Sequence, residues 1–355
     1  MIKIKVLVVD DSAFIRKALE NMLSGEQDIE IVGFATNGEE AVDLVAKLKP
    51  DVVTLDVEMP KMDGITALGK IMKASPVPVI MLSSLTQEGA DITLKALDLG
   101  AVDFIPKDKS YGSTGILKIS YELKNKIRRF AGDKSIVQRL RLTSSARPAA
   151  PISITQRPNV RAVSGRKKIV ALGTSTGGPQ SLQRVIPFLP ADLGVPVLVV
   201  QHMPPSFTQS LAMRLASMSK VKVVEAQGGE QVQPNWVYIA KGGKQMVIRR
   251  TPGGGVIELK PEDPNLLHNP SVDVMVNSVA EQFGKDSLGV IMTGMGNDGA
   301  KGLTTLKNKG GFVVSQDEAS CIVYGMPRAV VEAGIADEIV TLDDIAGRIT
   351  FHCKG

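Results

Sequence analysis

Short apolar segments that end in a carboxylate recur in the N-terminal part of the chain. Residues 5–9 (KVLVV) run into Asp10 and Asp11, and residues 51–55 (DVVTL) run into Asp56. A continuous apolar run of this length is typical of a strand that is buried on both faces of a parallel sheet. Helical spacing of apolar residues follows the first of these runs. The pattern predicts alternating strands and helices, which is the α/β class.

We expect further strands at residues 29–35, 77–82 and 102–105, and helices at residues 13–23, 38–48 and 115–130. Five parallel strands with intervening helices form a doubly wound sheet, which binds ligands at the carboxyl ends of its strands. Because these ends share one edge, Asp10, Asp11 and Asp56 should converge. Ser83 and Lys107 follow the last two strands and should lie beside them.

Three converging carboxylates repel one another unless a cation lies between them. A hard, oxygen-binding ion such as Mg²⁺ is the natural occupant. Lys107 adds an ammonium group and Ser83 adds a hydroxyl. This combination suits a phosphoryl group that is carried on a carboxylate and neutralised by metal and ammonium. Helix capping by single Asp residues is the alternative, but it does not require five polar residues at matching strand ends.

The positive charge of the chain comes from one segment. Residues 134–168 hold nine basic residues and no acidic ones, so the net charge of +5 becomes about −4 (5 minus 9) without them. The segment contains Pro and Ser and has little helical periodicity, which predicts a linker. A basic arm for nucleic acid or a membrane surface is the alternative, but no aromatic residue is present for base stacking. We expect a first domain at residues 1–130, a linker at 131–167 and a second domain at 168–350.

Composition favours a cytoplasmic protein that does not insert into a membrane. No apolar run approaches the roughly 20 residues that a membrane-spanning helix needs. The first residues do not resemble a secretory signal. Only two cysteines occur, Cys321 and Cys353, so a disulfide framework or a Cys-x-x-Cys metal site is excluded. No helix-turn-helix follows the first domain, which argues against a DNA-binding regulator.

The second domain also alternates between strands and helices. We expect strands at residues 168–172, 195–200, 221–226, 288–292 and 312–314. Residues 236–239 and 245–249 are predicted to form an antiparallel hairpin around the Lys241-Gly242-Gly243 turn. The fold class is therefore doubly wound α/β again, with a hairpin added. Polar residues once more follow the strands.

A nucleophilic serine is one interpretation of these polar residues. Ser175 lies in a GxSxG sequence between a strand and a helix, the turn that exposes a serine hydroxyl in many hydrolases. Of the three histidines, His202 ends a strand, whereas His268 lies in a Pro-flanked loop and His352 in the tail. Asp298 could orient His202 as the third member of a triad. The alternative is that His202 is an ordinary packed polar residue.

A dinucleotide site is a second interpretation. Residues 294–299 form a literal GxGxxG after a strand, and Asp317 follows the next strand. Against this, Asp298 lies inside the turn where a pyrophosphate would bind, and like charges repel. A non-enzymatic binding module that is switched by phosphorylation is the third possibility.

The first domain resembles the receiver domain of response regulators, a flavodoxin-like fold. The matching residues are Asp10-Asp11, Asp56 with Met59-Pro60-x-Met62-Asp63-Gly64, Ser83, and Phe104-x-Pro106-Lys107. The resemblance implies that Asp56 accepts phosphate from a histidine kinase. It also implies that Asp11, Asp56 and the backbone carbonyl of Glu58 hold Mg²⁺, with Asp10 acting through water. Phe104 stands where the family has a switch aromatic.

The second domain resembles the catalytic domain of CheB chemotaxis methylesterases. The matching stretches are Gly173-x-Ser175-Thr176-Gly177-Gly178, Gln201-His202-Met203-Pro204, Pro270-Ser271-Val272-Asp273, residues 293–299 (TGMGNDG), Glu318-Ala319-Ser320-Cys321 and Gly325-Met326-Pro327. The resemblance implies that Ser175 is the nucleophile, His202 the general base and acid, and Asp298 the orienting carboxylate. The backbone amide of Met295 would donate to the oxyanion.

Together the two resemblances imply a phosphorylation-activated methylesterase for chemotactic adaptation. Its substrates would be glutamate γ-methyl esters on the cytoplasmic part of methyl-accepting chemoreceptors, and glutamine deamidation would be a side activity. The receiver would inhibit the esterase until Asp56 is phosphorylated, and the esterase domain would need no cofactor. Two positions depart from the family pattern: Asn269 replaces an Arg or Lys, and residues 241–245 lack a His.

Overall fold

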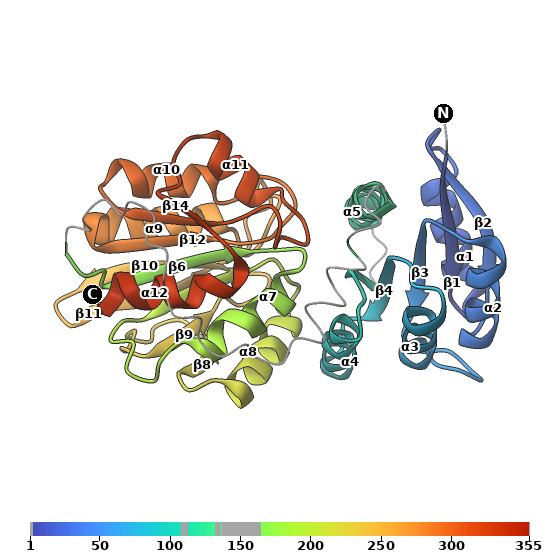
Figure 1. The fold of residues 1–355 in the computed structure, drawn as a ribbon, viewed down its shortest axis with the longest axis horizontal. Helices are drawn as coiled ribbons and strands as arrows, with labels where there is room; N and C mark the ends of the chain where they lie inside the picture. Colours follow the sequence, from blue (N-terminus) through green and yellow to red (C-terminus); the bar gives the residue numbers. More distant parts are fainter. Residues whose placement is uncertain (1–2, 108–112, 132–135, 137–164, 355) are drawn as a thin grey trace. The chain divides into compact units, whose positions relative to one another are not determined.

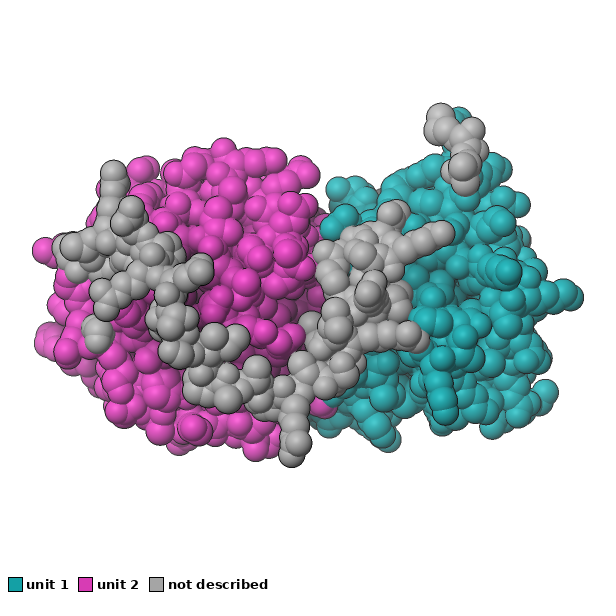
Figure 2. Space-filling view, in the orientation of Figure 1, with its two compact units in different colours: residues 1–146 teal, residues 147–355 magenta. Residues whose placement is uncertain are grey.

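The computed structural model describes residues 3–107, 113–131, 136 and 165–354. The chain divides into two compact units, residues 1–146 and 147–355 (Figure 2). The predicted linker, residues 131–167, lies mostly outside the described residues, so its boundaries stay predictions. Among the helices of the described residues, none is long and apolar enough to cross a membrane.

The first unit is built on a five-stranded sheet with the order β2-β1-β3-β4-β5 (Figure 1). All neighbouring strands pair in parallel, which confirms the predicted doubly wound fold. Its elements are β1 (Ile4–Val9), α1 (Ala13–Leu23), β2 (Ile29–Ala35), α2 (Gly38–Leu48), β3 (Val52–Asp56), α3 (Gly64–Ala74), β4 (Val79–Ser84), α4 (Gln87–Asp98), β5 (Asp103–Lys107) and α5 (Ser113–Ala131).

Side-chain caps fix where several of these helices begin. The Ser12 hydroxyl, the Asn37 amide oxygen and the Asp63 carboxylate each accept hydrogen bonds from backbone amides in the first turn of α1, α2 and α3. Such caps satisfy amides that have no partner within the helix. Strands β3 and β5 extend to Asp56 and Lys107 themselves, beyond the predicted ends.

The second unit is built on a seven-stranded sheet with the order β14-β13-β12-β6-β7-β9-β8. All its pairings are parallel. Helices α9 and α10 cover one face and α7, α8 and α12 the other (Figure 1). The elements are β6 (Ile169–Thr174), α7 (Gly178–Val185), η1 (Ile186–Phe188), β7 (Val197–Gln201), α8 (Phe207–Met218), β8 (Lys222–Glu225), β9 (Trp236–Ile239), β10 (Gln245–Thr251), β11 (Gly254–Lys260), α9 (Val272–Phe283), η2 (Gly284–Asp286), β12 (Ser287–Ile291), α10 (Ala300–Asn308), β13 (Phe312–Gln316), α11 (Met326–Glu332), β14 (Glu338–Val340), η3 (Leu342–Asp344) and α12 (Ile345–Lys354).

An antiparallel hairpin is present in the second unit, as expected, but the prediction that residues 236–239 and 245–249 form it is wrong. Strand β9 pairs in parallel with β7 and β8 inside the large sheet, where three of its four residues are buried. The partner of β10 is β11, in antiparallel register. The connection between them is the tight Pro252-Gly253 turn, and Gly254 adopts φ 122°, a conformation that favours glycine. A turn of two residues joins antiparallel strands, whereas the Lys241-Gly242-Gly243 turn joins two different sheets.

The sheet also continues beyond the predicted last strand at residues 312–314. Strand β14 pairs with β13, and its three residues, Glu338–Val340, are too few to give a recognisable apolar run. Helix α12 contacts β14 through Glu338: Arg348 Nε lies 2.7 Å and His352 Nε2 lies 3.3 Å from Glu338 Oε2. Burial alone would raise the pKa of Glu338, but His352 and Arg348 lower it to about 2.

Candidate functional site

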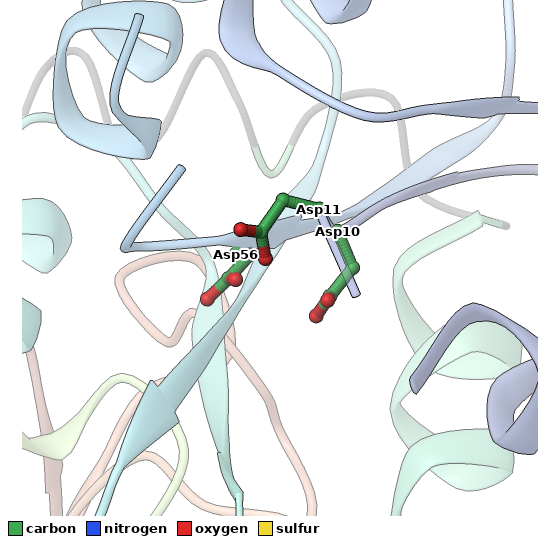
Figure 3. A group of neighbouring side chains, drawn as sticks. All are labelled: Asp10, Asp11 and Asp56. Atoms are coloured by element: carbon green, nitrogen blue, oxygen red, sulfur yellow. The ribbon is translucent and has the colours of Figure 1, made fainter. Parts of the chain in front are cut away.

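The three carboxylates predicted to converge in the first unit do so. One oxygen from each of Asp10, Asp11 and Asp56 lies within 4.8 Å of the others (Figure 3). Lys107 Nζ lies 2.8 Å from Asp10 Oδ2 and 2.7 Å from Asp56 Oδ2. Asp10 and Asp56 are buried and Asp11 is exposed, so the cluster lies at the surface end of the strands.

The charges of this cluster are strongly coupled. Burial raises the pKa of Asp56 to about 6, with a further upward contribution from Asp10 and a downward one from Lys107. Burial would lower the pKa of Lys107, but Asp56 and Asp10 outweigh it and raise the pKa. A set of hard oxygen donors with excess negative charge, two of them buried and one exposed, fits Mg²⁺, which binds carboxylates and keeps several waters.

The structure places the other predicted receiver residues as follows. Ser83 Oγ donates to the carbonyl of Gly89 at 3.1 Å and accepts from Thr93 Oγ1 at 2.6 Å, so these bonds run to α4 rather than to the carboxylates. Phe104 is buried. The Glu58 amide lies 3.4 Å from Asp56 Oδ1, which brings this residue to the cluster.

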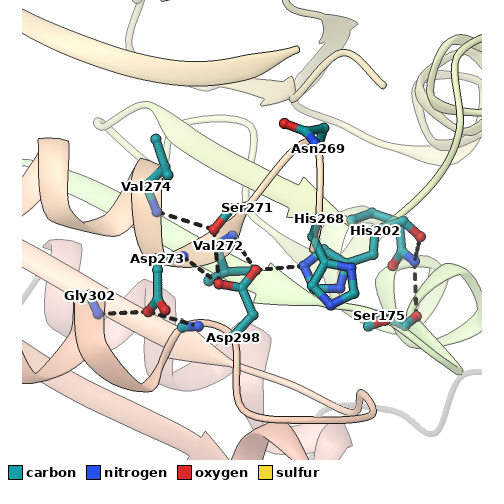
Figure 4. A network of polar contacts seen from close by, with 12 residues as sticks. Ser175, His202, His268, Asn269, Ser271, Val272, Asp273, Val274, Asp298 and Gly302 are labelled. Carbon is teal, nitrogen blue, oxygen red and sulfur yellow. Dashed lines mark hydrogen bonds and ion pairs between the residues drawn. The ribbon is translucent and has the colours of Figure 1, made fainter. Parts of the chain in front are cut away.

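The second unit collects three predicted site residues at one edge of its sheet. Ser175 follows β6, His202 follows β7, and Asp298 lies in the turn between β12 and α10. Strand β6 has β7 on one side and β12 on the other, so the three segments are neighbours. Figure 4 shows the His202 ring between Asp298 and Ser175.

Asp298 is an anchored carboxylate. Its Oδ2 lies 2.7 Å from His202 Nε2 and also accepts from the Val272 amide at 2.7 Å. Its Oδ1 accepts from the Asp273 amide at 3.0 Å and from Ser271 Oγ at 2.9 Å. Burial would raise the pKa of Asp298, but His202 and the amides at the start of α9 hold it well below its ordinary value. A fixed anion therefore faces the imidazole.

The other ring nitrogen of His202, Nδ1, is buried and has no polar partner among the described residues. Asp298 lies at Nε2, so Nδ1 is the ring nitrogen that remains free to accept a proton. In the serine-protease template the carboxylate lies at Nδ1 instead.

A buried glutamine, which the sequence analysis did not single out, links the serine and histidine segments. Gln201 Nε2 donates to the carbonyl of Ser175 at 2.9 Å and to that of His202 at 3.1 Å (Figure 4). A Cβ on Gly178 would lie 1.9 Å from Gln201 Oε1, so any larger residue there would displace the Gln201 side chain. A polar residue at the buried end of β7 was the only signal in the sequence for this role.

The turn at residues 294–296 lies directly beside Ser175. A Cβ on Gly294 would lie 2.9 Å from Ser175 Cβ. Within residues 165–354, no backbone hydrogen bond takes up the amide of Met295. An N–H group in this position can donate to an oxyanion that forms at the serine.

His268, which the sequence analysis assigned only to a loop, lies beside His202. Its ring stacks on that of His202, with centroids 3.8 Å apart and planes inclined by 12°. Asn269, one of the two departures from the expected pattern, accepts from Gln245 Nε2 at 2.6 Å and from the Asp263 amide at 3.0 Å. Lys241 lies in the second segment that departs from the family pattern, residues 241–245. Its Nζ lies 3.7 Å from Glu225 Oε2.

Two family models match the chain: CheB methylesterase over residues 170–349 and response regulator receiver domain over residues 6–112. The chain belongs to the CheB methylesterase family. A relative from Oleidesulfovibrio alaskensis, named protein-glutamate methylesterase/protein-glutamine glutaminase 1, is 45% identical over 98% of both chains. A relative of the same activity from Pyrococcus horikoshii is 45% identical over 97% of this chain and 92% of its own.

The solved structures agree with this assignment for the second unit. The crystal structure of the Thermotoga maritima CheB methylesterase catalytic domain matches with a TM-score of 0.51 and 43% identity, covering 52% of this chain and 98% of that one. As a CheB methylesterase, the chain is a carboxylic ester hydrolase with a receiver domain. The dinucleotide enzyme and the non-enzymatic module are therefore excluded. The GxGxxG turn serves to bring Asp298 to His202.

Proposed function

We propose that the chain is a phosphorylation-activated protein-glutamate methylesterase with protein-glutamine glutaminase activity. Its substrates are methyl-accepting chemoreceptors, its phosphodonor is the chemotaxis histidine kinase, and it acts in the cytoplasm during adaptation. The names of the relatives support the substrate chemistry. The observation that carries the proposal is the 2.7 Å contact between His202 and Asp298 beside Ser175.

The first half of the reaction is acyl transfer to the serine. Ser175 Oγ attacks the γ-carbonyl carbon of the methyl ester while His202 Nδ1 takes its proton. Asp298 stabilises the imidazolium that forms, because its carboxylate is already ionised and fixed. The Met295 amide donates to the oxyanion of the tetrahedral intermediate. When the C–O bond breaks, the imidazolium returns the proton to the leaving methoxide, and methanol departs.

The second half is hydrolysis of the acyl-enzyme. His202 Nδ1 takes a proton from a water molecule, whose oxygen attacks the same carbonyl carbon. Collapse of the intermediate releases the glutamate side chain, and Ser175 Oγ recovers its proton from the imidazolium. With glutamine as substrate the sequence is the same, except that ammonia replaces methanol as the leaving group. One site therefore accounts for both activities.

The receiver regulates the activity of the esterase unit. Asp56 is the phosphoryl acceptor, with Asp11, Asp56 and the carbonyl of Glu58 as Mg²⁺ ligands and Asp10 acting through water. When bound, the metal neutralises phosphoryl oxygens. Lys107 already contacts Asp56, so its ammonium group is placed to pair with the new phosphoryl group. Phosphorylation adds about −1.5 to −2 charges, and this relieves inhibition of the esterase unit by the receiver.

A methanol-release assay on methylated chemoreceptor tests the nucleophile. Ser175→Ala in the full chain should abolish release, since removal of a triad nucleophile costs about 10⁶-fold. The matched control is Ser217→Ala on the exposed face of α8, where the hydroxyl only donates to the carbonyl of Arg214. Substantial turnover by Ser175→Ala would refute the assignment.

A further inference from the structure

The stacking of two histidine rings at the hydrolytic site has no role in the mechanism above. The rings of His202 and His268 lie face to face, 3.8 Å between centroids. His202 arrives from the end of β7, whereas His268 arrives from the segment between β11 and α9. The contact is therefore long-range, and the fold has to bring the two rings together.

The segment that carries His268 is held by a buried side chain. Gln245 Nε2 donates to the carbonyl of His268 at 2.9 Å and to Asn269 Oδ1 at 2.6 Å. Gln245 Oε1 accepts from the Ser271 amide at 2.9 Å. The Gly243 amide donates to the carbonyl of Asn269 at 3.0 Å. These bonds fix the backbone at His268 and on its C-terminal side.

His202 needs support of this kind because its polar contacts leave its ring plane undetermined. Asp298 binds Nε2, at one edge of the ring, and Nδ1 has no partner among the described residues. A single hydrogen bond at one edge allows the ring to tilt about that bond. A flat ring packed parallel to it removes the tilt. When His202 becomes an imidazolium, the π face of the stacked ring also attracts the cation, provided that this ring carries no charge itself.

We propose that His268 is a positioning residue that holds the His202 ring in plane for proton transfer and supports its cationic form. The inference rests on the proposed roles of Ser175 and His202. It concerns the rate of serine activation and not substrate affinity. A flat aromatic ring at position 268 is sufficient for it, because the face of the ring makes the contact.

A fluorophosphonate probe tests the proposal on the full chain without a receptor substrate. Ser175 Oγ attacks the probe phosphorus and fluoride leaves, so labelling needs the base but not the chemoreceptor. Labelling rates against probe concentration give a maximal rate and a half-saturating concentration. We expect His268→Ala to lower the maximal rate about tenfold, with the half-saturating concentration unchanged. His268→Phe should restore most of the rate.

A neighbouring substitution serves as the control for the labelling experiment. Leu267→Ala changes the exposed neighbouring residue and should label at the normal rate. A normal maximal rate in His268→Ala overturns the inference, as does a change in half-saturating concentration alone, or failure of His268→Phe to recover. Labelling of Ser175→Ala or full-rate labelling of His202→Gln overturns the site itself. Normal labelling without methanol release leaves this inference intact and contradicts only the proposed substrate.

Discussion

Asp298 and Asp273 cap each other's helices. Asp298, just before α10, accepts from the Val272 and Asp273 amides at the start of α9. Asp273, in the first turn of α9, accepts through Oδ1 from the Gly299 amide at 2.9 Å and the Gly302 amide at 2.7 Å, at the start of α10. Only Asp298 also contacts His202. Two carboxylates in one network thus have different expected roles.

The first prediction separates the two carboxylates. Asp298→Asn should lower methanol release by about 10⁴-fold, because an amide no longer stabilises the imidazolium or selects its tautomer. Asp273→Asn should keep the rate within about tenfold, since its amide oxygen still accepts from the Gly299 and Gly302 amides. Equal losses in the two variants would mean that the helix caps, and not the contact with His202, control activity.

The second prediction concerns the receiver. Asp56→Asn should take up no phosphate from a small-molecule phosphodonor in the presence of Mg²⁺, measured as phosphoprotein after rapid quenching. The matched control is Asp51→Asn, which alters the carboxylate that accepts from the Lys5 amide, just before β3 begins. Removal of Mg²⁺ by a chelator should stop phosphate uptake by the unmodified chain. Phosphate uptake by Asp56→Asn would place the acceptor elsewhere.

The third prediction uses two glycines in the esterase unit. A Cβ on Gly325 would lie 2.6 Å from the carbonyl oxygen of Gly294, a backbone atom that cannot rotate away. Gly325→Ala should displace the turn that carries the Met295 amide and lower methanol release about 10²-fold. Gly347→Ala on the exposed face of α12 meets nothing within 4 Å. It should leave activity unchanged and raise the free energy of unfolding by about 0.5–1 kcal/mol.

The fourth prediction concerns acid stability. The pKa of Glu338 is about 2 in the folded chain, below its ordinary value of 4.5. Ionised Glu338 therefore stabilises the fold above pH 4.5, and this contribution is lost as the pH falls from 4.5 toward 2. Because the carboxylate is partly exposed, solvent screens the contact, and we expect Glu338→Gln to cost about 1 kcal/mol at pH 7.

Urea unfolding followed by tryptophan fluorescence measures this effect. The chain has a single Trp, Trp236 in β9, so the signal reports on the second unit alone. The difference between the original chain and Glu338→Gln should be largest at neutral pH and should shrink below pH 4.5. A difference that stays constant down to pH 3 would contradict the assigned pKa.

Much of this architecture could be read from the sequence because parallel strands place their ends at one edge. That rule predicted that Asp10, Asp11 and Asp56 converge. In the structure one carboxylate oxygen from each lies within 4.8 Å of the others. The same rule predicted that Ser175 and His202 lie at one edge of the second sheet. The first two helices and the first three strands of the receiver were also predictable, since apolar periodicity and caps such as Asn37 mark them. Helix α3 (Gly64–Ala74) was not predicted.

Long-range contacts made by irregular segments could not be predicted. No periodicity places the loop with His268 against His202, because the loop position depends on Gln245 in β10. Which nitrogen of His202 faces Asp298 depends on ring orientation, which spacing does not encode. The partner of β9 was missed because a short strand followed by a Gly-rich turn also fits a hairpin. The roles of the site residues stay predictions until the variants are measured.

The chain order of the esterase site affects how the enzyme is made. Ser175 and His202 leave the ribosome with β6 and β7, whereas Asp298 emerges only after β12. A nascent chain thus carries its proposed nucleophile and base well before the carboxylate that is proposed to orient the base. A chain that ends upstream of Asp298 would lack the third member of the proposed triad, together with α10, β13 and β14.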